Sequence, residues 1–132
     1  MKAIEEIKTE LERCPHVKYA INGNQVSVEP EDDSGFTLVF VDDSDEYVVH
    51  FDGWHEHFTD MKEAIDCFGF GLTAACRLAV LYRGATPVRW TLEVFEDGAW
   101  IPYSTTGLVF TPFWRRKRVA YLQNRFVSAN RS

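Results

Sequence analysis

Short runs of alternating apolar and polar residues, separated by tight turns, dominate this chain of 132 residues. Alternation with a period of two places the apolar side chains of a strand on one face. The dipeptides Asn22-Gly23 and Asp97-Gly98 stand between such runs, and both favour the two-residue turn of an antiparallel hairpin. The pattern therefore predicts antiparallel strands joined by short connections.

Two segments have helical periodicity instead. Residues 3–13 carry apolar side chains at positions i, i+3 and i+7, which predicts an amphipathic helix that ends before Pro15. Asp60 is expected to cap a second helix, with Glu63 completing a capping box. The core-facing stripe of this second helix is Met61, Ala64, Ile65, Phe68 and Leu72.

The carboxyl-terminal part of the chain is open to two interpretations. Residues 108–113 are predicted to form a strand. Residues 114–128 have apolar side chains at helical spacing, which favours a last helix. Alternatively, the basic residues 115–117 form a turn that leads into a last strand.

Together these elements predict an α+β fold over residues 1–132 as a single domain. We expect a curved, mainly antiparallel sheet with two or three helices packed on it, in the order α-ββββ-α-ββββ-α. In this scheme residues 53–58 connect the fourth strand to the second helix.

Charge is distributed unevenly along the chain. The net charge is −6, but residues 1–66 carry 17 acidic and 5 basic side chains, whereas residues 67–132 carry 3 and 9. The balances are therefore −12 and +6. Either the two halves neutralise each other in the folded chain, which we favour slightly, or one of them is a partner-binding face of one sign.

The three cysteines, Cys14, Cys67 and Cys76, form no C-x-x-C pair. An odd number and an acidic amino terminus favour reduced thiols in a cytoplasmic protein without a secretory leader. No apolar run approaches the ~20 residues that a membrane-spanning helix needs. We therefore expect no membrane partner.

The densest group of chemically versatile residues is His50, Asp52, His55 and His57. The His-x-His spacing on an extended segment points two imidazoles to one side, as a divalent metal site requires. A histidine beside Asp52 or Glu56 could also act as a general base. The competing interpretation, which we favour, is a strand-to-helix connection that binds no metal or other cofactor.

Aromatic residues crowd the second half of the chain. Tryptophan, tyrosine and arginine are the residues that dominate protein interfaces. We expect an interaction surface for a protein partner or a second copy of the chain, made by Trp90, Trp100, Tyr103, Trp114, Arg115 and Arg116. The alternative is that these rings pack on both faces of the sheet.

The run Arg115-Arg116-Lys117-Arg118 is the one basic cluster. With neighbouring aromatic rings it could hold a phosphate backbone. The acidic net charge argues against a nucleic-acid partner.

The stretches FDGWHEHF, CFGFGL and STTGLVFTPFW resemble a small family of bacterial proteins without assigned function, over about Val48 to Gln123. The resemblance implies a bacterial, cytoplasmic, single-domain protein, and it implies no activity, ligand or site. From the residues we expect a non-enzymatic interaction or regulatory module. The alternative is a small metal- or ligand-binding protein or enzyme that uses His50, His55 and His57.

Overall fold

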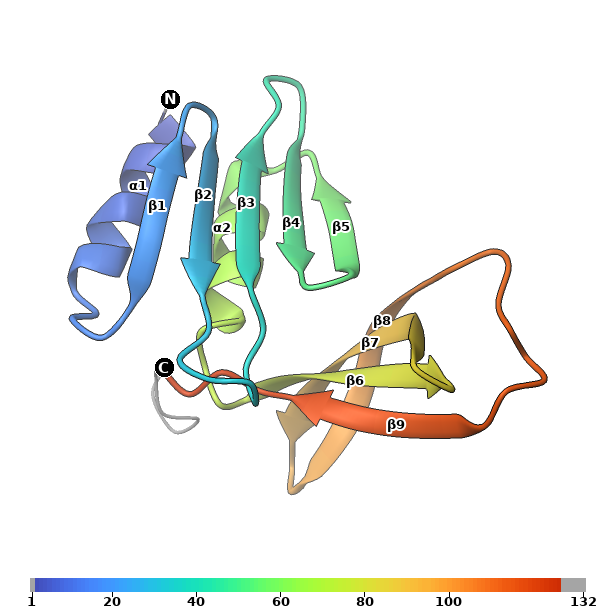
Figure 1. Cartoon of the computed structure of the whole chain (residues 1–132). Helices are drawn as coiled ribbons and strands as arrows, with labels where there is room; N and C mark the ends of the chain where they lie inside the picture. The colour runs from blue at the N-terminus through green and yellow to red at the C-terminus, as the bar shows by residue number, and fades with distance from the viewer. Residues whose placement is uncertain (1, 127–132) are drawn as a thin grey trace.

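The computed structural model describes residues 2–126, which contain nine strands and two helices. The strands form two antiparallel sheets, one of five strands and one of four (Figure 1). The mixed α+β class and the antiparallel pairing are therefore confirmed. The strands are divided between two sheets, however, instead of lying in one curved sheet.

The first sheet is a simple meander. Its strands, in the same order in sequence and in space, are β1 (Lys18–Asn22), β2 (Gln25–Glu29), β3 (Leu38–Asp42), β4 (Tyr47–Phe51) and β5 (Trp54–Phe58). Strand β3 lies in the middle, as its run of apolar residues predicts for a strand with neighbours on both sides.

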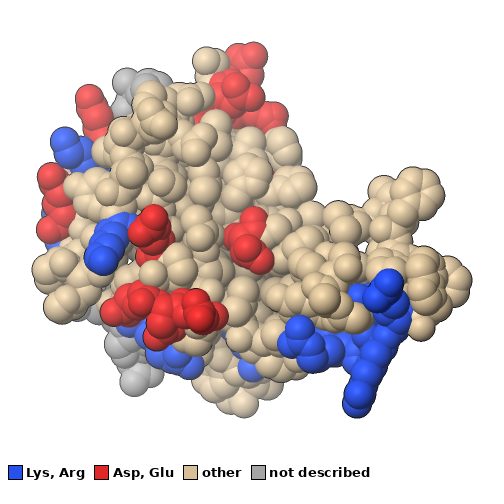
Figure 2. All heavy atoms as spheres, viewed as in Figure 1, with Lys and Arg blue, Asp and Glu red and all other residues tan. Residues whose placement is uncertain are grey.

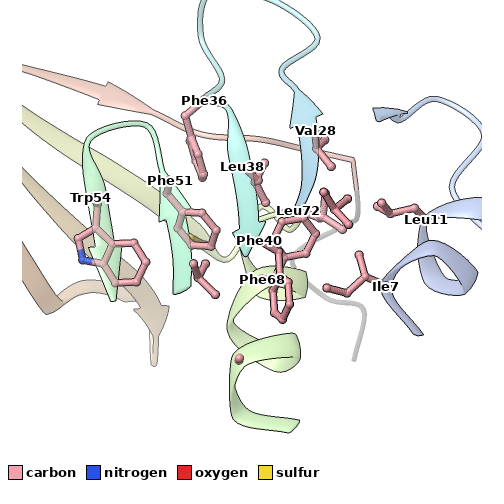
Figure 3. Close-up of a cluster of buried hydrophobic side chains, with 14 of the residues drawn as sticks. Ile7, Leu11, Val28, Phe36, Leu38, Phe40, Phe51, Trp54, Phe68 and Leu72 are labelled. Atoms are coloured by element: carbon pink, nitrogen blue, oxygen red, sulfur yellow. The ribbon is translucent and has the colours of Figure 1, made fainter. Parts of the chain in front are cut away.

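Helices α1 (Lys2–Glu12) and α2 (Met61–Phe70) lie on one face of this sheet, behind the strands in Figure 1. Their apolar faces pack on the sheet, and Ile7, Phe40 and Phe68 meet in the core between them (Figure 3). The predicted cap is confirmed, because the Asp60 carboxylate accepts a hydrogen bond from the Glu63 backbone N–H at 2.9 Å. Within residues 2–126, neither helix covers the opposite face of the sheet.

The second sheet has the order β8-β7-β6-β9. Its strands are β6 (Cys76–Arg83), β7 (Thr86–Glu96), β8 (Ala99–Gly107) and β9 (Lys117–Leu122). Leu78, Val80 and Leu92 on its inner face belong to the same apolar core as the residues under the two helices. The two sheets thus share one core.

Three predicted elements are wrong. Residues 117–122 form β9 instead of a helix, because they pair with β6 in the register Leu78↔Leu122; residues 127 and 128 of the predicted helix lie outside the described part. Residues 108–113 form a loop, since they have no partner strand among the described residues. Residues 54–58 form a fifth strand, so the observed order is α-βββββ-α-ββββ.

The segment after β9 is tied to the body of the molecule by Asn124, which is only 3% exposed. Its side-chain carbonyl accepts from the Phe36 backbone N–H, and its amide donates to the carbonyls of Phe36 and Gly71. One side chain thereby joins the segment before β3, the end of α2 and the end of the second sheet.

Candidate interaction surface

The three histidines lie together on the open face of the first sheet. His50 on β4 is the cross-strand partner of His55 on β5, and their ring centroids are 5.6 Å apart. His57 follows two residues after His55 on the same face, at 5.7 Å. The expectation that His55 and His57 point to the same side is therefore correct. The two residues lie on strand β5, however, and not in a strand-to-helix connection.

The fourth predicted metal ligand, Asp52, is occupied elsewhere. Its carboxylate accepts a hydrogen bond from the Trp90 indole N–H at 2.9 Å. His57 is paired with Glu46, with 2.5 Å between Nδ1 and Oε1. In residues 2–126 no three side chains of His, Cys, Asp and Glu are placed to hold a metal ion. This geometry gives the metal hypothesis no support.

The histidine face does predict a pH effect on stability. Partial burial lowers the pKa of His50 from its ordinary value of 6.5, and His55 and His57 add repulsion when charged. The unfolded chain therefore binds this proton more readily than the folded chain does. We expect the free energy of unfolding to fall as the pH drops through about 6.5 toward the lower folded-state pKa of His50.

Urea unfolding curves between about pH 7.5 and pH 5 will measure this effect. The variant His50→Gln has a polar side chain of similar size but no titrating ring, so its stability should vary less steeply over this interval. Parallel pH profiles for the two proteins would contradict the assignment to His50.

The second sheet contacts the first at the Asp52-Gly53 turn. Asp52 has a φ of 55°, in the left-handed region that aspartate tolerates. The indole of Trp90 lies directly on Gly53, where an added Cβ would come closer than 3.0 Å to three ring carbons. Trp90, which was predicted to belong to the interaction surface, is thus half-buried, with its indole against this turn.

Hydroxyl groups of β8 cover the edge of β5 beside this turn. The Ser104 hydroxyl accepts from the indole N–H of the fully buried Trp54 at 3.3 Å. Thr106 Oγ1 accepts from the His55 backbone N–H at 3.2 Å and donates to the His55 carbonyl at 3.3 Å. These contacts occupy hydrogen-bonding groups of β5 that an edge strand would otherwise leave open.

Trp100 lies on the outer face of the second sheet. The Arg77 guanidinium is sandwiched between the rings of Trp100, at 4.3 Å, and Tyr121, at 4.1 Å. Arg77 Nε also donates to the Glu93 carboxylate at 2.6 Å. The charged and aromatic side chains of this face therefore interact mainly with one another.

Tyr103 lies over a small hollow between α2 and the second sheet. The side chain is 57% exposed, and its hydroxyl donates to the Glu56 carboxylate over 3.4 Å. The hollow also contains Cys67, whose thiol pKa is raised to about 12 by burial and by Glu56. This thiol stays protonated near neutral pH, which is the opposite of an activated nucleophile.

The most exposed apolar residues lie in the loop of residues 108–116 between β8 and β9, which we call the tip loop. Val109 and Phe110 are 90% and 91% exposed, and Phe113 and Trp114 are more than two-thirds exposed. The loop projects from the body of the molecule at the right of Figure 1. Large exposed apolar patches are typical of interaction sites in general.

Both roots of the tip loop are fixed to the second sheet. At one root the Leu108 N–H donates to the Val88 carbonyl at 2.9 Å, and at the other the Gly84 N–H donates to the Arg116 carbonyl at 2.7 Å. Phe113 and Trp114 meet edge to face, with centroids 5.4 Å apart. The apolar side chains are thus presented by a loop anchored at both ends.

Four basic side chains, at residues 115–118, stand at one root of the tip loop. In Figure 2 blue groups lie beside the tan projection at the right, whereas the red acidic groups lie on the rest of this view, together with further blue groups. Of the predicted interaction residues, the structure therefore brings together Trp114, Arg115 and Arg116. Trp90, Trp100 and Tyr103 lie elsewhere.

Val109 and Phe110 were predicted to lie in a strand and were not among the predicted interaction residues. Their apolar character was visible, but the absence of a partner strand was not.

Comparison of the chain with protein-family models, curated proteins and solved structures returned no match. No helix within the described residues is long and apolar enough to span a membrane.

Proposed function

We propose that this chain is a cytoplasmic, non-enzymatic protein-interaction module that docks through its tip loop. The carrying observation is the exposure of Val109 and Phe110, at 90% and 91%, next to the exposed rings of Phe113 and Trp114. Burying one such side chain stabilises a complex by about 1.5–3 kcal/mol, and this chain leaves several in water. An anchored loop also loses little conformational freedom when it binds.

The surrounding charges support a protein partner of acidic character. Residues 115–118 supply four positive charges beside the apolar side chains, so the surface suits an apolar site with an acidic border. A nucleic acid is disfavoured by the net charge of −6. The protonated thiol of Cys67 and the free state of all three cysteines suit a cytoplasmic protein that does not use them for chemistry.

Photochemical cross-linking tests this function. A photoreactive phenylalanine analogue placed at position 110 should give a discrete protein adduct in the cells that produce the chain. The same analogue at Ile21, an exposed apolar position on β1, is the matched control and should give none. Val109→Ser/Trp114→Ser in the position-110 protein should reduce the adduct at least about tenfold, since a tenfold loss needs only 1.4 kcal/mol.

The substitutions should leave folding intact. Val109 and Trp114 are mostly in water, so the free energy of unfolding should change by less than about 0.5 kcal/mol. Adducts with lipid alone, or no adduct at position 110, would refute the proposed function.

A further inference from the structure

A second apolar feature lies on the other side of the molecule, in the groove between α1 and α2. The groove encloses about 1130 Å³ and ends near Cys14 and Phe126. Its accessible apolar lining includes Ile65, Phe70 and Phe126, which are half-buried, above a floor of buried core residues. It is large enough to receive several side chains of a protein segment.

Gly69 of α2 belongs to the lining of this groove. Glycine is disfavoured relative to alanine inside a helix. A Cβ at this position would meet nothing within 4 Å, so no packing contact requires the glycine. Position 69 therefore faces open space at the groove, and a side chain there would project into it.

The rim of the groove is acidic. Glu6, Glu10 and Asp66 contribute three carboxylates, against the single guanidinium of Arg13. The existing pairs, Glu10 with Arg13 at 3.5 Å and Asp66 with a lysine, are exposed and therefore weak. An apolar groove with an acidic rim is complementary in charge and in apolar character to the tip loop with its basic root.

We propose that the tip loop of one copy of this chain seats in the α1–α2 groove of a second copy, which gives head-to-tail self-association. The inference rests on the proposed function and names the partner as the chain itself. Within one copy the two surfaces cannot meet, because α1 and the tip loop lie at opposite sides of the molecule (Figure 1). In the contact, Phe110 and Trp114 enter the groove while Arg116 faces Glu6 and Glu10.

A contact of this type is heterologous, since each copy uses two different surfaces. A pair keeps one free tip loop on one copy and one free groove on the other, so assembly continues into a ring or a short filament. A contact between two tip loops would instead be symmetric and stop at a dimer. This difference makes the proposal testable with purified protein.

Two variants each remove one of the surfaces. Phe110→Ser/Trp114→Ser removes the tip, at side chains that are 91% and 71% exposed. Gly69→Arg removes the groove, because it adds bulk and positive charge opposite the incoming arginines. Gly69→Ala is the matched control, since its methyl group enters open space and leaves the groove accessible to a partner.

Sedimentation velocity or light scattering, from about 10 µM to about 1 mM, covers the range of weak protein contacts. The natural chain and Gly69→Ala should gain mass with concentration beyond 15.2 kDa, and each surface variant alone should stay at that mass. Each surface variant should raise the apparent Kd about 30-fold or more, as loss of a hot spot does. An equimolar mixture of the two variants should form pairs of twice the single-chain mass, because one supplies the tip and the other the groove.

Three outcomes would overturn the proposal: a natural chain that stays monomeric, surface variants that still associate alone, or a mixture that does not pair. Circular dichroism of each variant confirms that it is folded. If the natural chain stays monomeric while position 110 cross-links to a different protein in cells, this inference fails and the proposed function stands. If position 110 gives no protein adduct in cells, the proposed function itself fails.

Discussion

Replacing Asn124 by leucine should lower the free energy of unfolding by about 3–4 kcal/mol, because three hydrogen bonds to buried backbone are lost at once. The Asn124 side chain accepts from the Phe36 N–H at 3.1 Å, and donates to the Phe36 and Gly71 carbonyls at 3.0 and 3.2 Å. Leucine has nearly the same size but can form none of these bonds. The Phe36 N–H and the carbonyls of Phe36 and Gly71 would then remain buried without this hydrogen-bond partner. Each buried group without a partner costs about 1–3 kcal/mol.

Chemical denaturation measures this loss, and Asn24→Leu provides the matched control. Asn24 also donates its side-chain amide to a backbone carbonyl, that of Asp42 at 2.8 Å, but in an exposed hairpin where water can replace it. The control should therefore lose about 1 kcal/mol or less. If the two variants lose similar amounts of unfolding free energy, burial of the Asn124 hydrogen bonds does not explain their contribution to stability.

Local patterns in the sequence predicted the helices well. The capping box at Asp60 and Glu63 and the apolar stripes are short-range features, and they are sufficient because a helix forms its hydrogen bonds within one segment. The hairpin turn at residues 97–98 was predicted correctly, since the positive φ that it requires is a property of two residues. The first hairpin forms as well, but its turn residues are 23 and 24, because Asn22 pairs with Gln25.

Strand β5 was missed although the sequence contains its signal. Asp52-Gly53 has the same form as the dipeptide at residues 97–98, and it joins β4 to β5 in the register Phe51↔Trp54. The alternation of Trp54, Glu56 and Phe58 with two histidines then completes a strand. The Asp-Gly signal for a two-residue turn at residues 52–53 is therefore sufficient to predict this hairpin.

The errors near the carboxyl terminus have a different cause. Residues 108–113 contain more residues that favour strands than residues 117–122 do, yet only the second set pairs, with β6. Which segment reaches β6 is decided by contacts about forty residues apart in sequence, which local periodicity does not report. For the same reason, local periodicity does not reveal the role of Asn124, a single polar residue after β9. It also does not reveal that residues 108–116 form the tip loop.

The junction between the two sheets depends on the absence of a side chain at Gly53. The Trp90 indole lies on the Gly53 backbone and donates to Asp52 at 2.9 Å, so one ring holds both residues of the turn. Beside it, Ser104 and Thr106 bind β5 through their hydroxyls. A displacement of Trp90 would therefore disturb the turn and the neighbouring edge together.

Gly53→Ala should lower the free energy of unfolding by about 2–3 kcal/mol, since the new methyl group and the indole cannot occupy the same space. The φ of Gly53 is not in the left-handed region, so alanine is not opposed by the backbone itself. In a Trp90→Val background, where the overlying ring is gone, the same substitution should cost less than about 1 kcal/mol. Denaturation of the four proteins of this double-mutant cycle measures the coupling. Additive losses, with the alanine equally harmful in both backgrounds, would show that the indole is not what excludes a side chain at position 53.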